Sequence, residues 1–139
     1  MLETYLKECL YFTVSRLGRI ITRYAEEEFA KCGLSPTAAY LLMIVYESEG
    51  ITQKEIGQML HVQPSTVTRL IEKLLAKGLI RSRTEGRHSY IYSTEKGKAL
   101  EPSIHACWDA LRQRYSDILK DQSGEQLSLQ LDRICDQLD

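Results

Sequence analysis

Short hydroxyl side chains and one arginine gather just after Pro64. The polar side of this segment carries Ser65, Thr66, Thr68 and Arg69. A guanidinium can make two hydrogen bonds to one base edge, and small hydroxyls can bond bases or phosphates. Such residues, in place of the glutamates and lysines that ordinarily solvate a helix, indicate contact with nucleic acid. Taken alone, a face of this kind more often belongs to an ordinary surface helix, so the neighbouring elements must decide.

A short helix is predicted just before this segment. Thr52 and Glu55 form a capping box, in which the threonine oxygen accepts an amide of the first turn and the glutamate reaches back. The helix then continues for about two turns and ends near His61. Its apolar side carries Ile56, Met59 and Leu60.

The segment that begins at Pro64 is predicted to be a second helix. Proline fits the first position of a helix because the amide there has no helical partner. Gly78 stands where a left-handed residue can end the last turn. Two helices joined by a short turn, the second with a polar and basic side, form a helix-turn-helix. The buried side of the second helix is predicted to carry Val67, Leu70, Ile71, Leu74 and Leu75.

A small hairpin is predicted after the second helix. Apolar and polar residues alternate over 79–83 and over 90–93, which is the period of β-strands, and 85–88 is the turn between them. The tip would present Arg87 and His88, with Arg83 close behind. Because a narrow minor groove attracts an inserted arginine, the ordered set of two helices and a basic hairpin predicts a winged helix.

Further helices are predicted on both sides of the winged helix. One spans 2–31, another begins at Thr94 and runs to about residue 119 with a bend at Pro102, and a last one follows Ser123-Gly124. Their apolar stripes are too long for one small domain to bury, so they are predicted to pack against a second copy of the chain. The helix begun by Ser35-Pro36 is apolar nearly all round and belongs in a core.

The predicted fold is therefore mainly α, a winged helix-turn-helix with a small β-hairpin wing. The DNA-binding unit is expected at 35–94, flanked by N- and C-terminal dimerisation helices at 1–34 and 95–139. The acidic run 26–28 is interpreted as a solvated face, because consecutive helix positions point in different directions.

The charge of the chain is unevenly distributed. The net charge is -1, but residues 51–98 hold nine basic and four acidic residues, and the rest holds nine basic and fifteen acidic ones. A basic centre between acidic ends is typical of a chain that presents one face to phosphates.

Several other functions are disfavoured by the sequence. It contains no nucleophile elbow, phosphate-binding loop or zinc-protease motif, so an enzyme is not expected. Neither a cofactor nor a metal is expected, since His61, His88 and His105 lack metal-ligand spacing and the four cysteines are scattered.

The longest apolar run, 38–46, is far shorter than the roughly 20 residues that span a bilayer. With no secretory signal at the start, a cytoplasmic protein without membrane contact is expected. A winged helix that binds other proteins stays an alternative.

The order of these parts resembles that of the MarR (multiple antibiotic resistance regulator) family over essentially the whole chain, and four stretches carry the resemblance. They are S-P-T-A-A-Y-L-L-M at 35–43, T-Q-K-E-I-G-Q-M-L at 52–60, P-S-T-V-T-R-L-I-E-K-L-L-A-K-G-L-I at 64–80 and S-T-E-K-G-K-A-L at 93–100. The resemblance implies a homodimeric regulator, usually a repressor, that binds a palindromic operator in double-stranded DNA. It also implies release by a small ligand or by oxidation.

Within this resemblance, residues receive provisional roles. The second helix (Ser65, Thr66, Thr68, Arg69) would meet the major groove, and the wing (Arg83, Arg87, His88) the minor groove. Flanking phosphates would be held by Gln53, Lys54 and Lys73. Family wings usually carry an aspartate and an arginine two positions apart inside a longer hairpin. This chain has Glu85-Gly86-Arg87 in a shorter loop, which would reach less deeply into the groove.

The resemblance also suggests where an effector would act. Family ligands often bind between the dimer helices and the winged helix, which makes Tyr11, Arg16, Tyr40 and Trp108 candidate pocket residues. Aromatic residues at helical spacing are more often part of a core. Cys9 is a candidate redox thiol near tyrosines in the first helix, although a buried and inert thiol is the more common case.

Overall fold

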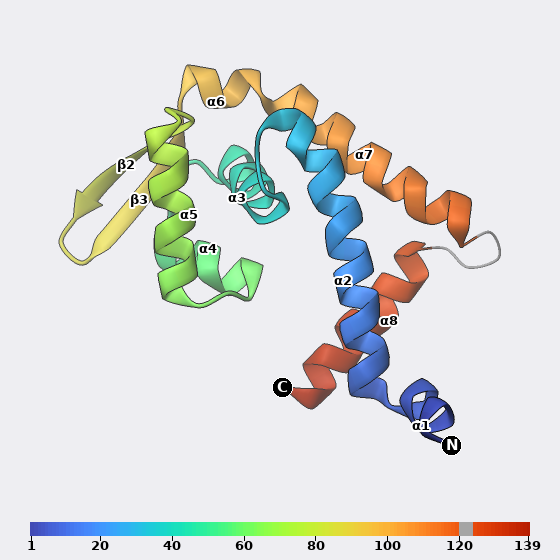
Figure 1. Ribbon diagram of the computed structural model, residues 1–139. Coiled ribbons are helices and arrows are strands. Elements are labelled where there is room, and N and C mark those ends of the chain that lie inside the picture. Colours follow the sequence, from blue (N-terminus) through green and yellow to red (C-terminus); the bar gives the residue numbers. More distant parts are fainter. Residues whose placement is uncertain (120–123) are drawn as a thin grey trace.

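The computed structural model describes residues 1–119 and 124–139. Over these residues the protein is mainly helical with one small antiparallel sheet (Figure 1). The elements in chain order are α1 (Leu2–Glu8), α2 (Leu10–Phe29), the short 3-10 helix η1 (Ala30–Cys32), α3 (Pro36–Glu47), β1 (Ile51–Thr52), α4 (Gln53–Leu60), α5 (Pro64–Ala76), β2 (Ile80–Glu85), β3 (His88–Ser93), α6 (Glu95–Ala99), α7 (Glu101–Ile118) and α8 (Gly124–Leu138).

The local signals in the central segment are confirmed. The Thr52–Glu55 capping box is complete in both directions, and His61 ends α4 in the left-handed conformation. Pro64 opens α5, and Gly78 follows its end with a φ of 72°. The chain therefore forms the predicted winged helix-turn-helix.

The sheet has the order β1-β3-β2, and the short strand β1 pairs with the middle of β3, at Tyr90 and Ile91. In the hairpin Ile80 pairs with Ser93 and Glu85 pairs with His88, which leaves a loop of Gly86 and Arg87 alone. Gly86 has a φ of 59°, as the first loop residue of a type II′ turn requires. The predicted turn at 85–88 is therefore confirmed, with Gly86 and Arg87 as its two central residues, and both strands extend further toward it than predicted.

The N-terminal helix is interrupted, contrary to the prediction of one helix over 2–31. Cys9 adopts an extended conformation (φ -84°, ψ 112°) and separates α1 from α2. The sequence carries neither glycine nor proline at this point, and α1 buries none of its residues. Nothing in the described part of the chain therefore holds α1 in line with α2, and the two helices diverge (Figure 1).

The predicted helix over 94–119 is also divided. Thr94 caps α6 by accepting the Gly97 amide, as expected. The chain then passes through Leu100 (φ -83°, ψ -14°) into α7, whose first turn contains Pro102. A proline lacks the amide that a continuous helix would need, which explains a break where a bend was predicted.

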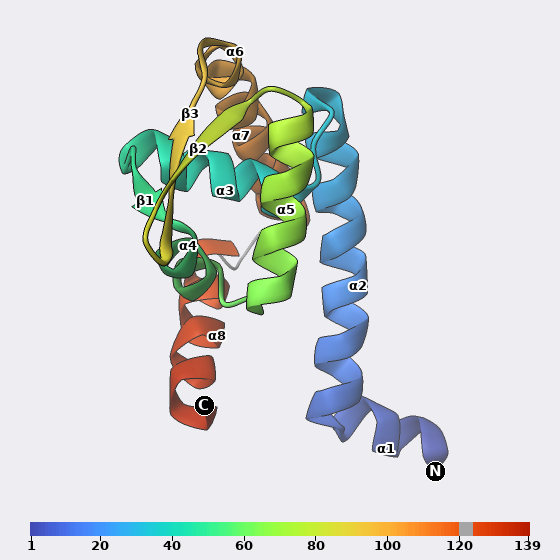
Figure 2. The ribbon, with the colours of Figure 1, turned by 90° about the vertical axis from the view of Figure 1, so that its left-hand side faces the viewer.

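One apolar core joins the winged helix to the flanking helices. The α3 side chains of Leu41, Leu42 and Val45 have no exposed surface. Phe29 at the end of α2 and Ile104 in α7 belong to the same cluster, as do Val67 and Leu74 of α5. The first half of α2 instead projects away from this core (Figure 2), and its apolar residues are exposed, Leu10 by 67%.

No single helix among residues 1–119 and 124–139 is long and apolar enough to cross a membrane. The segments Leu10–Cys32 and Pro36–Glu47 meet that requirement only when taken together, and they are bent by 62° relative to each other.

The junction between the hairpin and α6 depends on a glycine. A Cβ added at Gly97 would lie 2.0 Å from the carbonyl oxygen of Leu79. That oxygen already accepts the Thr94 amide at 3.1 Å, so it cannot move away freely. The Gly97 carbonyl in turn accepts the hydroxyl proton of Tyr46 from α3. Close backbone packing at this point fixes the base of the wing.

We expect Gly97→Ala to lower the free energy of unfolding by about 3 kcal/mol or more, because backbone on both sides must separate. The measurement is urea unfolding followed by circular dichroism. Lys98→Ala is the matched control in the same helix, since Lys98 is exposed and its ion pair with Glu95 is long at 3.7 Å. We expect it to change stability by less than about 0.5 kcal/mol. Equal stabilities of the two variants would contradict the assigned role of Gly97.

Candidate nucleic-acid interface

The second helix of the helix-turn-helix and the wing lie beside each other on one side of the molecule (Figures 1 and 2). On α5, Ser65, Thr68 and Arg69 are exposed and Thr66 is half-buried. The opposite side of the helix is buried through Val67, Leu70, Ile71 and Leu74, whereas Leu75 of the predicted stripe is 38% exposed. The helix therefore presents the predicted polar face to solvent.

Thr68 is engaged within the protein. Its hydroxyl donates to the Pro64 carbonyl at 3.0 Å and accepts the amide of Gln53 at 2.8 Å. A hydroxyl has one proton to donate, so in this arrangement Thr68 can offer DNA an acceptor but no donor. The same bond orients the Gln53 side chain and joins the starts of α4 and α5. Both residues therefore brace the two helices against each other.

Three cations around the two helices are exposed. The Arg69 guanidinium makes one long hydrogen bond, 3.4 Å, to the Thr66 hydroxyl. Lys54 and Lys73 have no hydrogen-bond or ion-pair partner among the described residues, and neither has Ser65. These side chains can therefore turn toward a phosphate or base without first breaking a strong contact.

The wing distributes its cations differently. Arg83 pairs with Glu85 at 2.5 Å on an exposed edge. Arg87 occupies the second position of the turn and is exposed, while the His88 ring lies 6.2 Å from that of Tyr90. Among the described residues, Arg87 at the tip has no ion pair and is available to DNA. Arg83 must first break its ion pair with Glu85 before it can bind a phosphate.

Other basic residues of the central segment are used within the fold. Arg81 lies over the ring of Tyr92 at 4.4 Å and supports the hairpin. The Lys77 ammonium donates to the Gly33 carbonyl at 3.0 Å, and that of Lys96 donates to the Lys77 carbonyl at 2.9 Å. Cations near the C-terminal end of a helix are stabilised by its dipole. These cations are exposed but already engaged within the protein, so only part of the basic excess read from the sequence is available at the candidate interface.

The candidate effector residues fall into two groups. Tyr40 of α3 and Trp108 of α7 meet edge to face, with ring centroids 5.4 Å apart. Both rings line a cavity of about 660 Å³ between α3, α7 and α8 and a second one of about 430 Å³ on the side of Leu60. Burial raises the pKa of Tyr40 above its ordinary value, so its hydroxyl stays neutral.

Tyr11, Arg16 and Cys9 do not line these cavities. Tyr11 is 82% exposed on the projecting half of α2, and Arg16 is exposed on the same helix. Cys9 lies at the break between α1 and α2 and is exposed as well. Cys9 is therefore not the buried thiol that is the more common case, because no element among the described residues covers the break.

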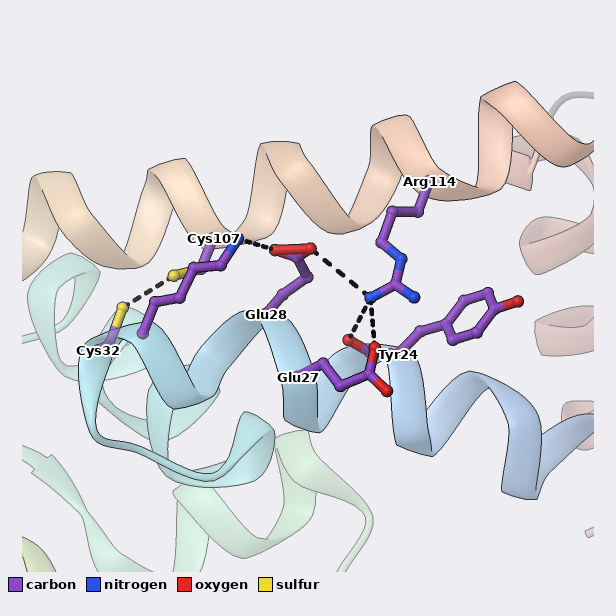
Figure 3. A network of polar contacts seen from close by, with 7 residues as sticks. Tyr24, Glu27, Glu28, Cys32, Cys107 and Arg114 are labelled. Carbon is purple, nitrogen blue, oxygen red and sulfur yellow. Dashed lines mark hydrogen bonds and ion pairs between the residues drawn. The ribbon is translucent and has the colours of Figure 1, made fainter.

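The structure also brings together residues that sequence reasoning missed. The sulfur atoms of Cys32 and Cys107 are 2.9 Å apart. Glu28 is buried beside them and pairs with Lys31 and Arg114 (Figure 3), so the acidic run 26–28 is not wholly a solvated face. The cysteines are 75 positions apart, and no local pattern indicates the pairing of α2 with α7 that joins them.

The chain is similar in sequence to a known family of regulators. Residues 33–89 match the model of the MarR family. The regulator SarZ of Staphylococcus epidermidis is 32% identical over 104 residues, which cover 71% of this chain and 69% of SarZ. The chain belongs to the MarR family of winged-helix transcriptional regulators. The family is non-enzymatic, so the expectation that the chain is not an enzyme is confirmed.

Other regulators align over different shares of their length. YybA of Bacillus subtilis is 28% identical over 94 residues, or 66% of this chain and 63% of YybA. TtmR of Methylorubrum extorquens is 36% identical over 64 residues, or 44% of this chain and 33% of TtmR. The chain thus spans less than two thirds of these two relatives.

Solved structures share the fold of this MarR protein. CouR of Rhodococcus jostii, bound to p-coumaroyl-CoA, has a TM-score of 0.79 and 25% identity and covers 93% of each chain. MepR of S. aureus in complex with DNA has a TM-score of 0.81 and 20% identity, and covers 94% of this chain and 98% of MepR. The predicted architecture, a winged helix-turn-helix with flanking N- and C-terminal helices, is confirmed.

The brace between α4 and α5 can be measured by a double-mutant cycle. We expect Gln53→Ala and Thr68→Ala to interact by about 0.5–1 kcal/mol in the free energy of unfolding, because each removes the same hydrogen bond. Gln58→Ala combined with Thr68→Ala is the control, since the exposed Gln58 makes no hydrogen bond among the described residues. If the interaction energy of Gln53 and Thr68 is no larger than that of Gln58 and Thr68, the hydrogen bond does not brace α4 against α5.

Proposed function

We propose that this MarR protein is a homodimeric repressor that reads a palindromic operator through α5 and is released by an effector. The observation that carries the proposal is the solvent-exposed face of Ser65 and Arg69 beside an exposed Arg87. Helix residues bond base edges in the major groove, while a wing arginine suits the narrow minor groove. The DNA and p-coumaroyl-CoA complexes of MepR and CouR support the same assignment.

The residues divide by role. Ser65, Thr66 and Arg69 read bases, and Lys54 and Lys73 hold flanking phosphates. Thr68 and Gln53 bind DNA through the atoms that their mutual hydrogen bond leaves available. At the wing, Arg87 enters the minor groove, and Arg83 and His88 contact phosphates.

The dimer is supported by the exposed apolar surface of the flanking helices. Leu10 and Tyr11 of α2 are 67% and 82% exposed, and Ile118 of α7 and Leu138 of α8 are 60% and 77% exposed. Large side chains rarely stay in water over a continuous surface unless another protein covers it. The regions 1–34 and 95–139 accordingly form the dimerisation region, and 35–94 forms the DNA-binding unit.

The effector site is the aromatic pair of Tyr40 and Trp108 with the cavities beside it. The larger cavity, about 660 Å³, lies within the range of small-molecule sites. Tyr40 supplies a neutral hydroxyl at its wall. Redox release through the exposed Cys9 is the second route, while Tyr11 and Arg16 can contribute only where a second copy covers them.

A winged helix that binds other proteins is the competing function. Such a surface would need apolar anchors at its centre. The exposed face of α5 carries hydroxyls and cations instead, which favours DNA.

The proposed function predicts selection of a palindrome from random duplex DNA. Half-sites should be separated by about one helical turn, because two α5 helices related by a two-fold axis enter successive major grooves. Binding should weaken steeply as the salt concentration rises, because the lysines and arginines of the protein release counterions from the DNA phosphates and added salt opposes this release. The measurement is selection and sequencing of bound duplexes, followed by titration across a salt series. Recovery of no enriched sequence, with weak salt dependence, would favour the protein-binding alternative.

Arg69→Ala and Lys73→Ala should separate base reading from phosphate binding. We expect Arg69→Ala to lose about 1–3 kcal/mol of operator binding while affinity for random duplex changes little. Lys73→Ala should weaken binding to both DNAs similarly and should reduce the salt dependence of binding by about 1 in the slope of log affinity against log salt. Fluorescence anisotropy with both duplexes gives the two losses. Equal losses for Arg69→Ala on both DNAs would reassign Arg69 to the phosphates.

A further inference from the structure

Cys32 and Cys107 form a pair of thiols between two helical elements. Cys32 closes η1 after α2, and Cys107 lies in the middle of α7. Their sulfur atoms are 2.9 Å apart, less than about 1 Å beyond the roughly 2.05 Å of a disulfide bond. A thiol is only a weak hydrogen-bond donor and acceptor, so the contact itself stabilises the fold little. Its consequence is that two oxidisable sulfurs are held within reach of each other.

The surrounding contacts fix this proximity. Beside the thiols, the Glu28 carboxylate of α2 accepts a hydrogen bond from the Lys31 ammonium at 2.8 Å. It also forms an ion pair with Arg114 of α7 at 3.6 Å (Figure 3). The Arg114 guanidinium also pairs with Glu27 at 2.9 Å and lies over the ring of Tyr24 at 4.0 Å. These contacts join the elements that carry the two cysteines. The sulfurs therefore meet through the packing of α2 against α7, not through two flexible surface side chains.

The two thiols differ in their access to solvent. Cys32 is half-buried, whereas Cys107 is buried with 5% of its surface exposed. A dissolved oxidant therefore meets Cys32 first. Once oxidised, Cys32 has a second sulfur in contact that solvent hardly reaches.

We propose that Cys32 and Cys107 are a reversible modification site that forms an intramolecular disulfide with a two-electron thiol oxidant such as hydrogen peroxide. The Cys32 thiolate attacks one peroxide oxygen, the O–O bond breaks, and a sulfenic acid and hydroxide result. The Cys107 sulfur then attacks the Cys32 sulfur, the S–O bond breaks, and its thiol proton leaves with the hydroxyl as water. Two thiols and one peroxide thus give one disulfide and two waters, with two electrons passing from the sulfurs to the peroxide.

The reaction is slow at neutral pH. Burial, and then the hydrogen bond to Cys107, raise the pKa of Cys32 to about 12, so little of the reactive thiolate is present. The charged and titratable groups around the pair are Lys31 and Glu28, with Arg114 on α7 and Tyr46 on α3. Lys31 and Arg114 are already paired with carboxylates. The site therefore responds to sustained oxidation and not to a brief pulse.

The position of the bond gives it a structural effect. The loop between the two cysteines contains residues 33–106 and therefore the complete winged helix. Closing so long a loop removes much freedom from the unfolded chain. In the folded chain the bond would also fix the end of α2 to α7, on which the winged helix is packed. The disulfide should therefore raise thermal stability without rearrangement of the core.

The test uses the full chain with the exposed thiols removed, as Cys9→Ser/Cys135→Ser, treated for hours with millimolar hydrogen peroxide at an alkaline pH, which raises the fraction of Cys32 thiolate. We expect the mass to fall by two hydrogens, and proteolysis without reductant to release the Cys32 peptide joined to the Cys107 peptide. The Tm should rise by roughly 10 °C, and dithiothreitol should reverse both changes.

The matched control is Cys32→Ser in the same background, which keeps the buried Cys107 and should show neither a linked peptide nor a rise in Tm. Unlinked thiols, or oxygen addition to Cys32 and Cys107 without a linked peptide, would overturn the proposal. A linked peptide accompanied by a fall in Tm would also overturn it, because the bond would then have formed in unfolded chains. None of these readouts depends on DNA, so the proposal can fail or hold separately from the proposed function.

Discussion

The packing of α3 is the constraint on which the rest of the structure depends. Leu41, Leu42 and Val45 are completely buried and hold together elements from both ends of the chain. Phe29 of α2 and Ile104 of α7 lie in the same core as the apolar side of α5. The winged helix is therefore not attached to the flanking helices by a flexible linker. Because a close-packed interior transmits displacements, the orientation of α5 is tied to how α2 and α7 sit on α3.

Much of the winged helix could be predicted from the sequence because its boundaries are set by local chemistry. The Thr52 capping box, Pro64, Gly78 and Thr94 each act within about one turn of the chain. The turn at 85–88 was also predicted, whereas the two strands were predicted too short, since their length depends on the pairing between them. The division at Leu100 was foreseen only as a bend, because Pro102 marks a weak point without fixing how the chain passes it.

Features that depend on distant partners could not be predicted in this way. The break at Cys9 has no local signal, and the contact of Cys32 with Cys107 requires the packing of α2 against α7. The polar face of α5 was identified correctly by residue type. However, the use of the Thr68 hydroxyl by Pro64 and Gln53 depends on how α4 meets α5. Sequence pattern therefore indicated which side chains face solvent, and the structure determined which of them still have atoms to offer.

The proposed effector would act through the same junction that orients α5. Tyr40 meets Trp108 at the cavities and, on its other side, meets the buried ring of Phe29 edge to face, with centroids 5.5 Å apart. A ligand shifts a protein between two arrangements only as far as it binds one of them better. At this site that difference would arise where α3 and α7 spread around the ligand, because Tyr40 is in direct contact with the core residue that ends α2. An effector at the cavities and a disulfide between Cys32 and Cys107 would therefore both act on the packing of α2 and α7 against α3.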